Sequence, residues 1–186
     1  MSGGTDPRAS RPARWAVAVA MRVILVRHAM PEADPARPPH LWRLGASGAA
    51  GARALSLPPG AWLVASTEPK AAETLQVATA GGHVLEDAGF DEVRRPHEWR
   101  DDHRERARAY VEGATPAGWE PRQQVAARFT AAVARHAARA GGGPLVVGTH
   151  GMALTTWLAA HQLITGPPGS FWAALAFPDV VTVDLP

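Results

Sequence analysis

The sequence contains no cysteine and no long apolar run, and lysine occurs once. Without cysteine the chain can form neither a disulfide nor a thiolate zinc site, and it cannot use a cysteine nucleophile. The lack of disulfides is compatible with a reducing compartment, and we expect a cytoplasmic protein. No stretch of eighteen apolar residues is present, so we expect no membrane-spanning helix.

Basic and acidic residues are balanced over most of the chain. Three of the nineteen basic residues and one of the seventeen acidic residues lie in positions 1–20, so residues 21–186 carry sixteen of each. A nucleic-acid-binding surface would need a clustered excess of positive charge. The arginine-rich stretch 94–108 is interleaved with Asp and Glu and predicts a solvated, salt-bridged helix face. We therefore expect no nucleic-acid partner.

The length of 186 residues fits one domain preceded by a short tail. Residues 1–20 are rich in Pro, Gly, Ser and Arg, a composition typical of disorder, so we expect the domain to span 21–186. Strand-like and helix-like segments alternate in that span, which indicates an α/β fold. Strands are predicted at 21–26, 61–65, 83–85 and 145–148, with a closing hairpin formed by 171–177 and 180–185; helices are predicted at 47–57, 69–80, 101–112, 121–140 and 152–164.

Two polar motifs follow apolar strands that lie far apart in the sequence. Arg27 and His28 end the run at 21–26, and His150 follows the run at 145–148. In open α/β sheets, ligands gather at the carboxyl ends of strands. Another Arg-His pair, at 135–136, falls inside a predicted helix, where we expect it at the surface. Both pairs have the same composition, so His28 is distinguished from His136 by its position at the end of a predicted strand.

The residue types at this sheet edge suit phosphoryl chemistry. A neutral imidazole can attack phosphorus when one ring nitrogen is free and an acceptor holds the other N–H, which makes His28 the candidate nucleophile. Phosphoryl transfer otherwise needs positioning and positive charge around three equatorial oxygens. Arg27 offers a two-pronged guanidinium for those oxygens, and His150 offers a second imidazole.

Lys70 is the single lysine in a chain with eighteen arginines. It falls in the first turn of the predicted helix 69–80, where a positive charge opposes the helix dipole. A nearby anion would offset this penalty, and that anion would be a substrate phosphate or the carboxylate of Glu73. Two interpretations of Lys70 stay open: a compact charge selected for phosphate, or an ordinary surface residue.

These motifs resemble those of the histidine phosphatase superfamily, also called phosphoglycerate mutase-like. Residues 27–29 (Arg-His-Ala) resemble its strand-end Arg-His-Gly signature, and residues 149–151 (Thr-His-Gly) resemble its second histidine motif. Residues 66–74 are similar to its Ser-Pro-Leu-x-Arg-Ala-x-Gln-Thr segment, with Lys70 in place of the arginine. The resemblance covers about residues 21–185 and implies a three-layer α/β/α sandwich around a mostly parallel sheet.

By this resemblance His28 is the residue that becomes phosphohistidine, and Arg27, Lys70 and His150 line the phosphate pocket. The family's acid precedes a Gly-x-Trp-Glu-Gly loop, which residues 91–93 followed by 97–99 match loosely. We assign Glu92 as proton donor to the leaving oxygen and then as base for water. Asp91 and Glu98 are the alternatives for this role.

The resemblance implies a metal-independent phosphatase that hydrolyses a small phosphomonoester without a cofactor. A mutase and a protein phosphohistidine phosphatase are alternatives within the family, and a non-catalytic phosphate-ester-binding module is the alternative of another class. We expect no metal site, because His97, His103 and His161 lack the spacing of metal ligands and are expected as isolated surface residues. We also expect no membrane partner.

Overall fold

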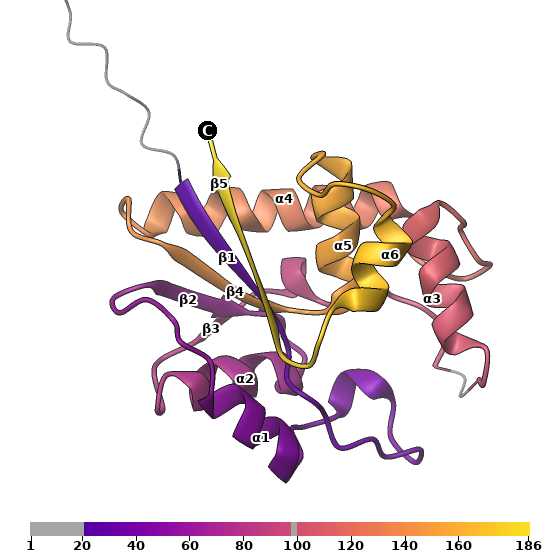
Figure 1. Cartoon of the computed structure of the whole chain (residues 1–186), viewed down its shortest axis with the longest axis horizontal. Coiled ribbons are helices and arrows are strands. Elements are labelled where there is room, and N and C mark those ends of the chain that lie inside the picture. The colour runs from indigo at the N-terminus through magenta and orange to yellow at the C-terminus, as the bar shows by residue number, and fades with distance from the viewer. Residues whose placement is uncertain (1–20, 98–99) are drawn as a thin grey trace, which may run out of the picture.

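A five-stranded sheet forms the centre of the protein, with helices on both of its faces (Figure 1). The computed structural model describes residues 21–97 and 100–186, so the predicted tail and the alternative acid Glu98 lie outside the described residues. The strands are ordered β3-β2-β4-β1-β5 across the sheet. They are β1 (Met21–Arg27), β2 (Trp62–Ala65), β3 (Leu85–Glu86), β4 (Leu145–Thr149) and β5 (Asp179–Leu185).

Strands β1 to β4 run parallel, and β5 is antiparallel to β1 at one edge of the sheet. The parallel strands are joined by helical crossovers, as parallel pairing requires. The helical elements are α1 (Ala46–Arg53), α2 (Pro69–Ala78), α3 (His103–Glu112), α4 (Arg122–Arg139), α5 (Gly151–Ala160) and α6 (Pro168–Ala174), with short 3-10 turns η1 (Pro39–Leu41) and η2 (Ala88–Phe90). None of the helices in the described ranges is long and apolar enough to cross a membrane.

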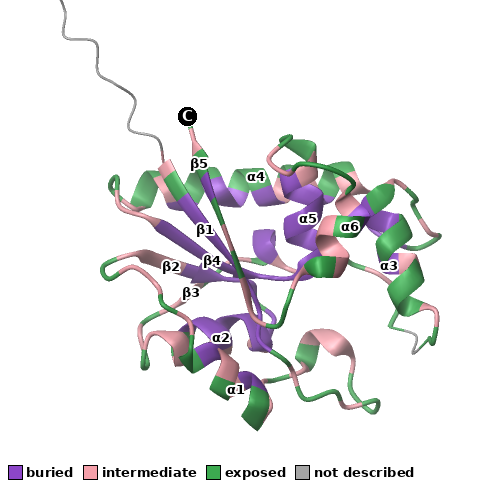
Figure 2. Cartoon of the chain, viewed as in Figure 1, coloured by how far each residue is buried: buried purple, intermediate pink, exposed green. Residues whose placement is uncertain are grey.

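Apolar side chains of β1 alternate between the two faces of the sheet, because neighbouring side chains of a strand point in opposite directions. Val23 and Leu25 pack into the core shared with α3, α4 and α5, whereas Ile24 and Val26 pack into the core shared with α2. The buried residues accordingly follow the sheet and the inner sides of the helices (Figure 2). The predicted three-layer α/β/α arrangement is confirmed.

The predicted closing hairpin is wrong. Residues 168–174 form helix α6 instead of a strand, beginning at Pro168, whose ring suits the first helical position. This short helix packs against α3 and α5, where its partly buried Phe171 and Trp172 contact the hydrophobic core. Strand β5 pairs with β1, far back in the sequence. The helix predicted at 152–164 also ends earlier, at Ala160.

The prediction that the second Arg-His pair lies at the surface is wrong for His136, which is buried on the inner face of α4. Its Nδ1 accepts a hydrogen bond from Trp62 Nε1 at 3.1 Å, and its Nε2 donates to Asp87 at 3.0 Å. Arg135 forms an exposed ion pair with the same carboxylate. His136 is thus a hydrogen-bonded core histidine that joins α4 to the sheet.

The segment that follows His28 passes close to helix α1. At Gly48 a Cβ atom would lie 2.0 Å from the carbonyl oxygen of Met30, two residues after His28. No side chain fits in that space, so the glycine lets α1 and this backbone approach each other.

We expect Gly48→Ala to lower the free energy of unfolding by about 1–3 kcal/mol, the usual cost of overpacking a filled site. Urea denaturation would measure the change. Gly45→Ala is the control, because a Cβ there would make ordinary contacts at 3.6 Å and beyond. Equal stability of Gly48→Ala and the parent protein would contradict the tight approach.

Candidate active site

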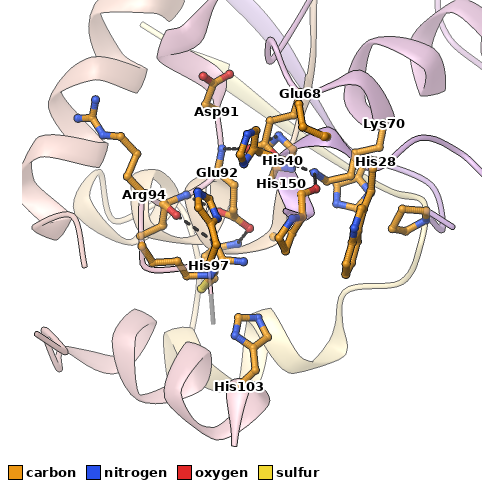
Figure 3. A pocket seen from close by; sticks show the side chains of 18 of the residues that line it. His28, His40, Glu68, Lys70, Asp91, Glu92, Arg94, His97, His103 and His150 are labelled. Atoms are coloured by element: carbon orange, nitrogen blue, oxygen red, sulfur yellow. Dashed lines mark hydrogen bonds and ion pairs between the residues drawn. The ribbon is translucent and has the colours of Figure 1, made fainter. Parts of the chain in front are cut away.

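The parallel register of the sheet brings both histidine motifs to one edge. Arg27 of β1 lies opposite Thr149 of β4, so His28 and His150 follow at the same level. Their ring centroids are 5.1 Å apart. A cavity of about 1180 Å³ opens over them, and Figure 3 shows both imidazoles in its wall.

His28 is held in the form that a nucleophile needs. Its Nδ1 lies 2.8 Å from the carbonyl oxygen of Ala29, and because a carbonyl only accepts, Nδ1 carries the proton and Nε2 carries the free electron pair. Burial lowers the pKa of His28 well below its ordinary value, and the neighbouring His150 and Lys70 lower it further. The imidazole is therefore neutral at physiological pH.

His150 is fully buried and is the N-cap residue of α5. Its Nε2 lies 2.8 Å from Ser66 Oγ, whose own proton goes to Asp91, so Nε2–H is the donor in this contact. Burial, with Lys70 as the next contribution, lowers the pKa of His150 well below its ordinary value. Nδ1 is then an acceptor, and within the described residues it has no hydrogen-bond partner. An O–H group of a monoprotonated phosphate would satisfy it.

Arg27 is buried beside the two histidines. Its Nη1 donates to the carbonyl oxygen of Leu175 at 2.6 Å, and its guanidinium carbon lies 3.4 Å from the centre of the Phe177 ring. Burial lowers the pKa of Arg27 to about 10, which leaves it protonated at neutral pH. A Cβ at Gly151 would lie 3.2 Å from Arg27 Nε, so this glycine leaves room for the side chain.

Lys70 lines the cavity and is buried, so the interpretation of an ordinary surface residue is wrong. Its ammonium forms an ion pair with Glu68 and donates to the carbonyl oxygen of Pro39 at 2.8 Å. The local anion is thus Glu68 rather than Glu73, which pairs with Arg43 instead. The side chains of Lys70 and Glu68 are 7% and 11% exposed, which makes this a buried ion pair.

The candidate acids Asp91 and Glu92 hold different positions in the same wall. Asp91 accepts hydrogen bonds from the hydroxyls of Ser66 and Thr67 at 2.8–2.9 Å. The carboxylate of Glu92 accepts from the backbone amides of Val93 and Ala153, each at 2.9 Å. Glu92 therefore lies at the N-terminus of α5, beside His150, where a negative charge is favourable.

The cavity brings together all five residues predicted for the site: Arg27, His28, Lys70, Glu92 and His150. Sequence reasoning assigned no role to Glu68, although it stands inside the motif at 66–74. Glu68 Oε1 accepts from the Glu92 amide at 2.9 Å and lies 3.7 Å from His150 Nε2. The signal that could have found it is its position two residues before the single lysine.

The model of the histidine phosphatase superfamily (branch 1) matches residues 23–180. The chain therefore belongs to this superfamily, as its motifs indicated. A search of curated proteins found no match.

Solved structures share the fold at low sequence identity. Bacillus stearothermophilus YhfR is 21% identical, with 88% of this chain and 90% of that chain covered and a TM-score of 0.67. A mycobacterial glucosyl-3-phosphoglycerate phosphatase is 23% identical over 84% of this chain and 85% of its own, with a TM-score of 0.60. A putative α-ribazole-5'-P phosphatase from Escherichia coli is 21% identical over 89% and 90% of the two chains, with a TM-score of 0.59.

We expect Glu68→Gln to lower the free energy of unfolding by about 3 kcal/mol, because it leaves the buried Lys70 charge without its counter-ion. Urea denaturation at neutral pH would measure this loss. Asp184→Asn is the control, since it breaks an exposed ion pair with Arg22 and should change stability much less. A loss no larger than that of the control would show that the buried pair is not stabilising.

Proposed function

We propose that this protein is a metal-independent phosphatase that hydrolyses a small phosphomonoester through a phosphohistidine intermediate. The observation that carries the proposal is the neutral imidazole of His28, with Nδ1 held by a carbonyl and Nε2 free, in the wall of a cavity beside Arg27, Lys70 and His150. Membership of the histidine phosphatase superfamily supports the same reaction class.

In the first step, Nε2 of His28 attacks phosphorus in line and the bond from phosphorus to the ester oxygen breaks. Glu92, in its protonated form, gives its proton to the departing alkoxide. Arg27 and Lys70 neutralise the equatorial oxygens, and Nδ1 of His150 accepts a hydrogen bond from a protonated phosphate oxygen. The products of this step are the free alcohol and phosphohistidine.

In the second step, the Glu92 carboxylate takes a proton from water as the water oxygen attacks phosphorus. The bond between nitrogen and phosphorus breaks, and its electron pair returns to Nε2 of His28. Glu92 suits this role among the carboxylates lining the described part of the cavity, because Glu68 is bound to Lys70 and Asp91 to two hydroxyls. The carboxylate of Glu92, by contrast, accepts hydrogen bonds from the backbone amides of Val93 and Ala153.

The shape of the cavity favours a small molecule over a phosphorylated protein. Residues 94–97 and Arg100, with His103 and Arg106 of α3, line its outer part opposite the histidines. A shallow open site would have favoured a protein phosphohistidine phosphatase. The backbone amides that hold the Glu92 carboxylate keep a non-catalytic phosphate-ester-binding module as the second candidate, because such a module keeps the cations of the phosphate pocket and lacks a productive acid.

We expect the protein to hydrolyse p-nitrophenyl phosphate in the presence of EDTA, and His28→Ala to lose at least about 1,000-fold in kcat/KM. Acid-labile phosphate should label the parent protein and not the variant. His83→Ala, at an exposed position, is the matched control. Phosphate-ester binding without turnover by the parent protein would favour the binding module.

We expect Glu92→Gln to lower kcat by about 100-fold or more for alkyl phosphates, and less for p-nitrophenyl phosphate, because nitrophenolate leaves without a proton. Steady-state kinetics on both esters would measure the difference. Asp91→Asn and Glu98→Gln are the comparison variants. A larger, leaving-group-dependent loss in either of them would move the acid to that residue.

A further inference from the structure

The two ends of the cavity differ in charge. At the inner end, the cations Arg27 and Lys70 are matched by the carboxylates of Glu68 and Asp91, and the two histidines are neutral. The outer end is lined by arginines and histidines, and His103 reaches toward the cavity from α3, across from His28 and His150 (Figure 3). The excess positive charge of the cavity therefore lies away from the reacting histidines.

Three of the outer residues surround one buried aromatic ring, that of Trp119. The guanidinium carbons of Arg95 and Arg106 each lie 5.7 Å from its centre, within the range of a cation–π contact. The ring of His103 lies 6.4 Å from the same centre. We call Arg95, His103 and Arg106 the outer basic cluster. Its members come from two segments, the loop after η2 and helix α3.

The outer basic cluster differs from the other arginines of this region in its partners. Arg94 pairs with Glu120, and Arg108 pairs with Glu112 on the exposed side of α3. Neither Arg95 nor Arg106 forms an ion pair with any residue in 21–97 or 100–186.

Arg95 donates one hydrogen bond, to the carbonyl oxygen of Val93. The carboxylate of Asp102 interacts electrostatically with His103 and Arg106 and is hydrogen-bonded to Arg100.

Such a cluster attracts an anion. Burial lowers the pKa of His103, and the charges of the half-buried Arg95 and Arg106 lower it further. The two guanidinium groups contact the same ring and carry the same charge, so they repel each other. The arrangement is complementary to a group with several negatively charged oxygens, which arginine binds in a two-pronged manner.

We propose that the substrate carries a second anionic group, a phosphate or a carboxylate, which binds Arg95, His103 and Arg106 while the ester phosphate lies at His28. The proposal rests on the proposed phosphatase function and narrows its substrate class to small phosphomonoesters with an anion at the far end. A second anion site would also account for the balanced charge of the inner pocket. The outer basic cluster would attract the anionic substrate and orient it, so the inner pocket needs no excess positive charge for this purpose.

The test uses three series of synthetic esters with two to six carbons: alkyl monophosphates, α,ω-alkanediol bisphosphates and ω-carboxyalkyl phosphates. Release of inorganic phosphate gives kcat/KM for each. We expect at least one bisphosphate or carboxyalkyl phosphate to exceed the monophosphate of equal length by about tenfold or more, the effect of one or two charge-assisted hydrogen bonds. The series that shows the preference identifies the anion as phosphate or carboxylate.

The preference is the ratio of kcat/KM for a dianionic ester to kcat/KM for the monophosphate of equal length. Measuring it in two variants shows where the second anion binds. In Arg106→Gln the preference for the dianionic ester should fall to within about twofold of unity, because one arm of the cluster is lost. Arg108→Gln, on the opposite side of the same helix, should keep the full preference. Monophosphates hydrolysed as well as both other series, or a preference that Arg106→Gln leaves intact, would overturn the proposal while the phosphatase function stands.

Absence of turnover with every ester would instead count against the proposed function, and calorimetry then decides the further proposal. Binding of the bisphosphates would be measured with the parent protein and with Arg106→Gln. A dissociation constant at least about tenfold weaker in the variant supports the second anion site. Equal binding by both proteins, or binding no tighter than that of the monophosphates, overturns it.

Discussion

The parallel pairing of β1 with β4 is the constraint on which the site depends. The two strands are far apart in the sequence, and their register places Arg27 opposite Thr149, so the next residue of each chain segment is a histidine. The amide of His28 donates to the Thr149 carbonyl at 2.9 Å, which continues the ladder beyond the last strand residue. A slip of one residue would exchange the faces to which the side chains of β1 point and would separate the imidazoles.

Around the histidines, the carboxylate of Glu68 joins groups from three parts of the chain. One oxygen binds Lys70, and the other accepts from the Glu92 amide and lies near His150. Burying charges is costly unless their partners satisfy them, and here each carboxylate oxygen has a partner. The result is a wall in which Glu68 connects a lysine, an acid and a histidine through an ion pair, a hydrogen bond and a close contact.

The C-terminal part of the chain completes this wall. The segment between α6 and β5 supplies the carbonyl of Leu175 and the ring of Phe177, both of which hold the guanidinium of Arg27. Because β5 pairs with β1 along its whole length, this segment is anchored directly beside the strand that carries Arg27. The fold thus closes the site with residues that precede its last strand.

Local pattern was enough to predict the α/β class, the two strand ends and the positions of Arg27, His28 and His150, because strand burial and helix caps leave periodic and short-range signals. The same signals placed Lys70 in the first turn of α2. They failed for residues 168–174, where an apolar run fits a strand or a helix equally well until the element that covers it is known. They also failed for His136, whose burial depends on Trp62 and Asp87 from other elements.

Tertiary structure alone decided which charges meet. The partner of Lys70 is Glu68 rather than Glu73, because the extended backbone at Glu68 turns its carboxylate toward the ammonium while Glu73 faces Arg43. In the same way, Arg95 and Arg106 face the cavity instead of the solvent-exposed ion pairs that their sequence neighbours suggested. Sequence determined which groups are available, and packing determined their distances, since contacts between distant segments follow from how the helices cover the sheet.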